Sequence, residues 1–197
     1  MRDAPRLGAY LAQLPAGLDS HPECTAKASV VRKVYEFARD NPLVGLPEPL
    51  QRLLDEPLPS STWVPQAQVL AAIVAMVEAR CFDPETEREW VRRAATHLFA
   101  SSMYRILMWA ATPRMVFKSA QIRWSAFFRG TRLESEVFER SARVRLISPD
   151  GLFNPDLQTI FAEVMYAAVN YTRDDASAAS LVLLEEDPER IEYLGTW

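Results

Sequence analysis

The chain has 197 residues, of which 49% are hydrophobic and 24% are charged, and this composition fits one compact domain. The net charge of −4 opposes a general affinity for nucleic acid, and no apolar run approaches the roughly 18 residues of a membrane-spanning helix. The two cysteines, Cys24 and Cys81, lie far apart without a pairing motif, so we expect reduced thiols and a cytoplasmic protein.

The first part of the chain, residues 1–64, is expected to be a helical segment followed by a proline-rich connector. Residues 22–38 read as a helix. The prolines that follow in quick succession predict a rigid connector with one short helix over residues 49–55. Residues 65–197 are expected to form a helical bundle plus a sheet, in one compact unit with the N-terminal segment.

Three dipeptides each place a capping side chain before a proline at the first helical position: Asp83-Pro84, Thr112-Pro113 and Asn154-Pro155. Apolar residues at three-and-four spacing follow each of them, so each predicts a helix with a buried face. The apolar face of the second helix continues to Phe128.

Two further helices are expected before the sheet. Residues 65–80 are apolar almost throughout, which predicts a helix at the centre of the bundle. A short helix is expected over residues 103–110, after the serine pair that ends the preceding helix.

The period changes from helical to alternating after Gly130. Residues 133–137 and 142–146 predict a hairpin whose strands place apolar side chains on one face. Residues 181–185 and 191–197 predict a second hairpin after the Asn154 helix. The fold class is therefore α+β: an N-terminal helical bundle packed with a small four-stranded antiparallel sheet, in the order hairpin, helix, hairpin.

The charges are distributed unevenly along the chain. Residues 88–145 hold twelve basic and four acidic side chains, a balance of +8, whereas residues 174–192 hold seven acids and one arginine, a balance of −6. Either the two segments face each other or they mark a partner surface, and the intramolecular explanation is favoured.

Two stretches carry a resemblance to known proteins. Residues 14–27, LPAGLDSHPECTAK, and residues 128–131, FRGT, resemble a paralogous family of myxobacterial proteins over most of the chain. The order of elements from Pro84 to Trp197 is similar to heme-nitric-oxide-binding (H-NOX) domains and to the related vinyl-reductase-type domains. That resemblance implies a scaffold in which helices precede a hairpin, helix, hairpin unit.

The sequence departs from the H-NOX pattern where that family holds heme. The resemblance implies a proximal histidine on the helix before the sheet, but residues 120–124, AQIRW, contain none. The Tyr-x-Ser-x-Arg motif that grips the propionates is reduced to Ser141 and Arg143. Because axial ligation needs a strong donor, conventional heme is not expected.

No other cofactor or metal is expected either. His97 is a lone helical histidine, which is more often a packing residue than a ligand. His21 and Cys24 have metal-ligand spacing, but two donors do not complete a roughly four-coordinate zinc site. The nucleophile-turn, zinc-protease, phosphate-loop and dinucleotide signatures are all missing, so we do not expect an enzyme.

Two hypotheses remain for the function. The first is a non-enzymatic signalling or protein-interaction module, homodimers included, without nucleic-acid or membrane partners. It would use basic side chains toward a partner or an acidic group: Arg123, Arg129, Arg140, Arg143 and Arg145.

The alternative is a small-molecule sensor that binds an apolar or acidic ligand between helices and sheet. Aromatic residues would line its pocket: Trp90, Phe99, Trp109, Phe117, Trp124, Phe127, Phe161 and Tyr166. The density of ordinary protein interiors favours a filled core over such a pocket.

Overall fold

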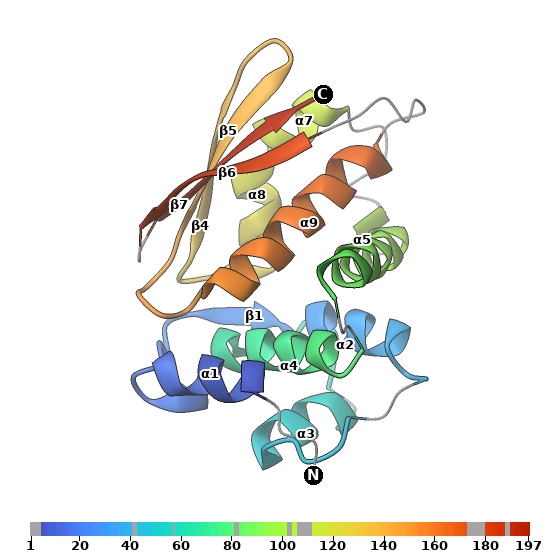
Figure 1. Ribbon diagram of the computed structural model, residues 1–197, viewed down its shortest axis with the longest axis vertical. Helices are drawn as coiled ribbons and strands as arrows, with labels where there is room; N and C mark the ends of the chain where they lie inside the picture. Colours follow the sequence, from blue (N-terminus) through green and yellow to red (C-terminus); the bar gives the residue numbers. More distant parts are fainter. Residues whose placement is uncertain are drawn as a thin grey trace.

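The computed structural model describes residues 5–40, 43–56, 58–80, 83–101, 104–105, 112–172, 180–187 and 190–197. Figure 1 shows a four-stranded sheet at one end of the molecule and a layer of N-terminal helices at the other, with α5 and α9 between them. Within the described ranges, no helix combines the length and the apolar character needed to cross a membrane. The predicted helix over residues 103–110 lies largely outside these ranges.

The N-terminal layer consists of helices packed around a central one. Their bounds are α1 Pro5–Gln13, α2 Ala28–Phe37, α3 Glu48–Asp55 and α4 Gln66–Glu78, with a short 3-10 turn at Gly17–Asp19, and α5 (Pro84–Ala100) follows between this layer and the sheet. Helix α4 is buried along nearly its whole length, as its continuous apolar sequence predicts. The predicted short helix over residues 49–55 is confirmed as α3.

Helix α1 lies within the expected N-terminal helical segment, although no helix was assigned to these residues in particular. It buries Leu7 and Tyr10, and the Tyr10 hydroxyl donates a hydrogen bond to the Leu152 carbonyl at 3.1 Å. Its stability therefore comes from tertiary packing.

A three-stranded antiparallel sheet was also missed by the sequence analysis. It joins β1 (Thr25–Lys27), β2 (Trp63–Pro65) and β3 (Phe128–Arg129) in the order β2-β1-β3. Strand β1 replaces the first turns of the helix predicted over residues 22–38, and β3 follows the last turn of the helix predicted from Thr112. Strands of two or three residues are too short to show a period, and they form here because distant segments supply the hydrogen bonds.

This small sheet brings together the two stretches that carry the family resemblance. Thr25 pairs with Arg129 across β1 and β3. Gly130 follows with a φ of +79°, and a Cβ atom there would lie 2.6 Å from the Glu23 carbonyl oxygen and 2.7 Å from the Cys24 Cα. Only glycine fits this backbone contact.

The C-terminal half follows the predicted order of hairpin, helix and hairpin. It contains β4 (Arg132–Val137), β5 (Ser141–Ile147), α9 (Pro155–Tyr171), β6 (Ser180–Asp187) and β7 (Arg190–Thr196). The strands are antiparallel in the order β4-β5-β7-β6, so the four-stranded sheet is confirmed. Helix α9 packs against β6 and β7 on one side and against α5 on the other.

The predicted proline-started helices differ in how well they match. Asp83 caps α5 by accepting hydrogen bonds from the backbone of Glu85 and Thr86, and Asn154 caps α9 by accepting one from Leu157. The helix predicted from Thr112 is divided into α7 (Pro113–Lys118) and α8 (Ala120–Ser125).

The division falls at Ser119. Its hydroxyl donates to the Met115 carbonyl at 2.6 Å, and its ψ of 12° leaves the helical region. Serine in a helix competes for backbone acceptors in this way, which bends or ends the helix. As a result, α7 and α8 both pack against β4.

Candidate functional site

A partly open cavity of about 210 Å³ lies between the N-terminal helices and the C-terminal half. Helices α2, α4 and α5 form one side, and α8, α9 and β4 form the other. Packing between these two layers therefore leaves an accessible space, although ordinary packing density favours a filled core.

The walls of the cavity are almost entirely apolar. Its described lining residues are aliphatic, aromatic or thioether-bearing except for Arg123 and Tyr104, and nearly all of the surface that faces the cavity is apolar. The Trp124 indole N–H is already bonded, because it donates to the Thr131 hydroxyl at 3.0 Å. Such a surface can hold a ligand mainly by burying apolar area.

The structure brings together most of the aromatic residues that the sequence analysis assigned to a pocket. Those that line the cavity are Trp90, Phe99, Trp124, Phe127 and Phe161. Phe117 is fully buried elsewhere and stacks on Trp197 with the ring centroids 5.3 Å apart. Tyr166 lies outside the cavity, under the guanidinium of Arg92 at 4.0 Å, and Trp109 lies outside the described residues.

Ring contacts hold the aromatic wall in place. Trp124 stacks on Phe128 at 4.0 Å and meets Phe161 edge-on at 5.6 Å. Tyr104 stacks on Phe127 at 4.1 Å. The wall is therefore set by packing between α8, β3 and α9, and not by one helix alone.

Arg123 is the charged residue of the cavity wall. It lies on α8 one turn after Ser119, and its Nε donates a hydrogen bond to the Ser119 hydroxyl at 2.6 Å. Partial burial lowers the pKa of Arg123, because desolvation disfavours the charged guanidinium. The serine at the helix break thus also fixes the position of the Arg123 side chain.

The other arginines predicted to contact a partner lie elsewhere. Arg143 and Arg145 form ion pairs with the buried carboxylate of Glu192 on the neighbouring strand, at 2.8 and 2.7 Å. These pairs hold the pKa of Glu192 below its usual range. For these residues the charge asymmetry of the sequence has the intramolecular explanation that was favoured.

The remaining two predicted contact residues are separate from this cluster. Arg129 stacks on the Trp63 ring at 3.9 Å in the three-stranded sheet. Arg140 is exposed at the tip of the first hairpin. The five arginines therefore do not form one continuous basic surface.

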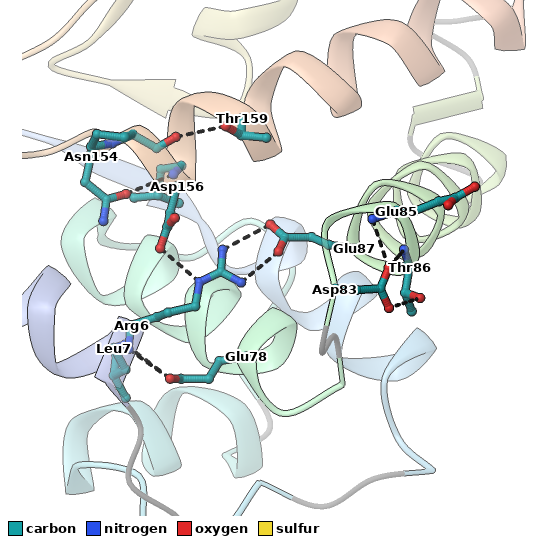
Figure 2. Close-up of polar contacts among 12 residues, drawn as sticks. Arg6, Leu7, Glu78, Asp83, Glu85, Thr86, Glu87, Asn154, Asp156 and Thr159 are labelled. Atoms are coloured by element: carbon teal, nitrogen blue, oxygen red, sulfur yellow. Dashed lines mark hydrogen bonds and ion pairs between the residues drawn. The ribbon is translucent and has the colours of Figure 1, made fainter.

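A second, polar cleft of about 450 Å³ adjoins the cavity where the first turns of α5 and α9 meet α1. Figure 2 shows Arg6 at its centre, bonded to both carboxylate oxygens of Glu87 at 2.7 and 3.0 Å and to Asp156 at 2.9 Å. Val91 and Ile160 line both the cleft and the cavity, so these two side chains separate them.

Neither of the two histidines lines the cavity. His97 lies on the exposed side of α5, with its ring 5.6 Å from that of Phe37. His21 lies in the loop before β1, where its Nε2 is 3.1 Å from the Asp150 carbonyl oxygen. No group of three or more histidine, cysteine or acidic side chains in the described ranges is arranged to hold a metal ion.

Comparison with known proteins identifies the fold. No protein-family model and no curated protein matches the chain. Among solved structures, a single-residue variant of Tt H-NOX superposes with a TM-score of 0.55 at 12% identity, covering 86% of this chain and 94% of that one.

A second match is an oxygen-binding H-NOX domain related to soluble guanylate cyclases, with a TM-score of 0.51 at 11% identity, covering 85% of this chain and 90% of that one. The chain therefore has an H-NOX-like fold, as the order of its elements predicted. The myxobacterial and vinyl-reductase resemblances stay predictions.

The cavity does not fit the heme that this fold family implies. Its described walls contain no histidine or cysteine, and burial raises the pKa of Tyr104, which opposes the phenolate that ligation would need. The volume of about 210 Å³ is also below the roughly 300–1,000 Å³ of sites for drug-sized ligands.

Proposed function

We propose that the protein is a small-molecule sensor module whose cavity binds a compact apolar ligand without histidine-ligated heme. The observation that carries this proposal is the partly open apolar cavity of about 210 Å³ between the two halves of the fold. The likeness to an oxygen-binding H-NOX domain supports it as an analogy, since that protein also binds a small molecule.

The size of the cavity limits the ligand. An engineered apolar cavity of about 150 Å³ binds benzene or xenon, so a cavity of about 210 Å³ suits a somewhat larger molecule, such as one ring with a short chain. A ligand in contact with α5 on one side and α8 and α9 on the other would stabilise their packing. That coupling is the physical basis for sensing.

The proposal is tested by titrating the purified chain with ethylbenzene and indole and measuring binding by calorimetry. Ala94, a buried residue of the cavity wall, is replaced by leucine to occupy the space. The matched control replaces Ala71, which is equally buried on α4 but lies away from the cavity.

Binding to the native chain and to Ala71→Leu, with loss of binding in Ala94→Leu, is the expected result. At 100 times Kd the ligand should stabilise the native chain by about 2.7 kcal/mol. Absence of heat and of any thermal shift with either probe would count against the sensor function. Native mass spectrometry of freshly purified protein would show any ligand acquired in the cell.

A protein-interaction module, the second candidate, is favoured by one edge of the four-stranded sheet. Strand β6 is an edge strand that exposes Val182, Leu183 and Leu184 by 53%, 43% and 47%. Exposed apolar edges pair readily with other strands. Light scattering after size exclusion tests self-association, and Leu183→Lys should abolish any dimer formed through this edge.

A further inference from the structure

We propose that the outer face of the three-stranded sheet binds an acidic segment of a partner protein, and that Lys27 and Arg129 pair with its carboxylates. The surface lies outside the cavity, so this inference goes beyond the proposed function and does not depend on a bound ligand. The four side chains that form the surface are named the basic face: Thr25, Lys27, Trp63 and Arg129.

The register of the short strands places these four side chains on one face of the sheet. Lys27 on β1 lies opposite Trp63 on β2. Thr25, two residues before Lys27 on the same strand, lies opposite Arg129 on β3. Ala26 between them points to the other face and is fully buried. The basic face itself is half-buried to exposed, so a partner can reach it.

Two cations meet at one aromatic ring on the basic face. The Arg129 guanidinium carbon lies 3.9 Å from the centroid of the Trp63 ring, and Lys27 Nζ lies 5.5 Å from the same centroid. Within the described ranges, neither side chain forms an ion pair or a hydrogen bond. Like charges near one ring repel each other, so an anion within reach of both is attracted by both.

The segments that form this sheet supply no carboxylate of their own. Each of its strands lies in a stretch without aspartate or glutamate: residues 24–35, 57–77 and 90–133. The arginines of β5 differ, because they are paired with Glu192 on the neighbouring strand. The positive charge of the basic face is therefore complementary to an external anion.

The arrangement of Arg129 suits a carboxylate. Its guanidinium rests on the Trp63 ring through its face, whereas its N–H groups lie in the guanidinium plane. These N–H groups match the two oxygens of a carboxylate, and the Lys27 ammonium is a second, compact cation. Aspartate or glutamate side chains spaced along an extended segment can pair with both.

A nucleic acid is disfavoured on the same face. Its bases bind single-strand sites by stacking on aromatic rings, but Arg129 already covers Trp63. The net charge of −4 also opposes a long polyanion that passes over the rest of the molecule. A short acidic segment of a protein contacts the basic face alone.

The basic face adjoins the wall of the cavity. Phe127 and Phe128 both line the cavity. Lys27 Nζ lies 5.5 Å from the centroid of the Phe127 ring, and Arg129 follows Phe128 on the opposite face of β3. The partner surface and the cavity therefore share one layer of the structure.

The test measures the affinity of a labelled peptide of alternating glutamate and serine residues by fluorescence anisotropy at pH 7 and low salt. A peptide of alternating glutamine and serine is the neutral probe. The variants are Lys27→Met and Arg129→Met. Arg140→Met is the matched control, since Arg140 is an exposed arginine outside the basic face. Circular dichroism confirms that each variant is folded.

The native chain and Arg140→Met should bind the glutamate peptide about 10-fold more tightly than the glutamine peptide. Lys27→Met and Arg129→Met should each weaken binding of the glutamate peptide by about 3- to 10-fold. The double variant should bind both peptides equally. Added salt should weaken binding to the native chain, because exposed ion pairs are screened.

Three results would overturn the proposal. The first is equal binding of the two peptides by the native chain, or equal weakening by Arg129→Met and Arg140→Met. The second is a labelled oligothymidylate that binds more tightly than the glutamate peptide and is lost in Arg129→Met, which would indicate a nucleic-acid site. The third is a dimer in light scattering that Arg129→Met disrupts, which would place a second copy of the chain on this face.

A measurement on the native chain is independent of whether the variants fold. Titration of the isotope-labelled chain with the glutamate peptide should move the amide NMR signals of β1, β2 and β3 and leave those of β6 unchanged. Shifts that omit the three short strands would contradict the proposal. No probe in these experiments enters the cavity, so their failure leaves the proposed function standing, and a failure of ethylbenzene to bind leaves the basic face standing.

Discussion

Enlarging an alanine should stabilise the protein at the cavity and destabilise it in the filled core. Ala94 on α5 and Ala71 on α4 are both buried alanines in helices, but only Ala94 lines the cavity. A leucine at position 94 can extend into empty space, whereas a leucine at position 71 must displace packed neighbours. The two substitutions are chemically identical, so their difference reports the cavity alone.

The expected magnitudes follow from the cavity volume. At about 24 cal/mol per Å³, an enclosed void of about 210 Å³ would lower the stability by about 5 kcal/mol relative to a filled core, which is an upper bound for this partly open cavity. One leucine fills only part of the void, so Ala94→Leu should raise the free energy of unfolding by about 1–2 kcal/mol. Ala71→Leu should lower it by about 1–3 kcal/mol through overpacking.

Urea unfolding followed by tryptophan fluorescence measures both effects, with thermal unfolding as a second assay. For a chain of this length, each kcal/mol corresponds to a shift in Tm of about 2–4 °C. The two variants should shift the Tm in opposite directions. Equal destabilisation by both leucines would show that the interior around Ala94 is as densely packed as that around Ala71, and the cavity would have to be abandoned.

Three further substitutions test the polar and backbone contacts. Gly130→Ala should destabilise the protein by about 2–5 kcal/mol in urea unfolding, because its φ is positive and the new Cβ would overlap the backbone at Cys24. Glu192→Gln should lower the free energy of unfolding at pH 7. The native pKa of Glu192 is lowered, so its contribution is present above the unfolded pKa and is lost as the pH falls through the native pKa. The difference in stability between this variant and the native chain should therefore shrink below about pH 5. Arg6→Met should cost about 1–2 kcal/mol by thermal unfolding, and adding Glu87→Gln should restore part of it, since one unpaired carboxylate is then removed.

The parts of the fold that local chemistry determines could be predicted from the sequence. Asp83 and Asn154 each cap a helix at the residue before a proline, because the side-chain oxygen accepts hydrogen bonds from the first helical N–H groups. Alternation of apolar residues predicted the first hairpin, and the proline-containing loop between residues 181–185 and 191–197 predicted the second, because both signals are local.

The parts that depend on distant segments could not be predicted. The three-stranded sheet forms from pieces of two or three residues around β1, and nothing within Thr25–Lys27 distinguishes it from the start of a helix. The signal that was available is the glycine at position 130, whose positive φ marks a turn next to a close backbone contact.

The candidate site was predictable in composition but not in arrangement. Aromatic residues at helical spacing indicated a buried face, and five of them do line the cavity. The break at Ser119 starts α8 as a separate helix and so places Arg123 among the residues that line the cavity. Arg143 and Arg145 instead form ion pairs with Glu192 between β5 and β7. Neither the helix break nor the ion pairs can be predicted from the spacing of residues in the sequence.

The cavity also bears on why this scaffold would bind a ligand at all. Single domains are typically stable by only about 5–15 kcal/mol, so a cavity that lowers stability by up to about 5 kcal/mol has a large effect. A ligand that fills the space offsets this cost by restoring contacts to walls that otherwise face empty space. Stabilisation would then spread to α5, α8 and α9, the helices that meet at the cavity. Hydrogen exchange with and without ethylbenzene should therefore slow in these three helices and stay unchanged in α3, which lies outside the cavity; uniform slowing along the chain, or none, would contradict this coupling.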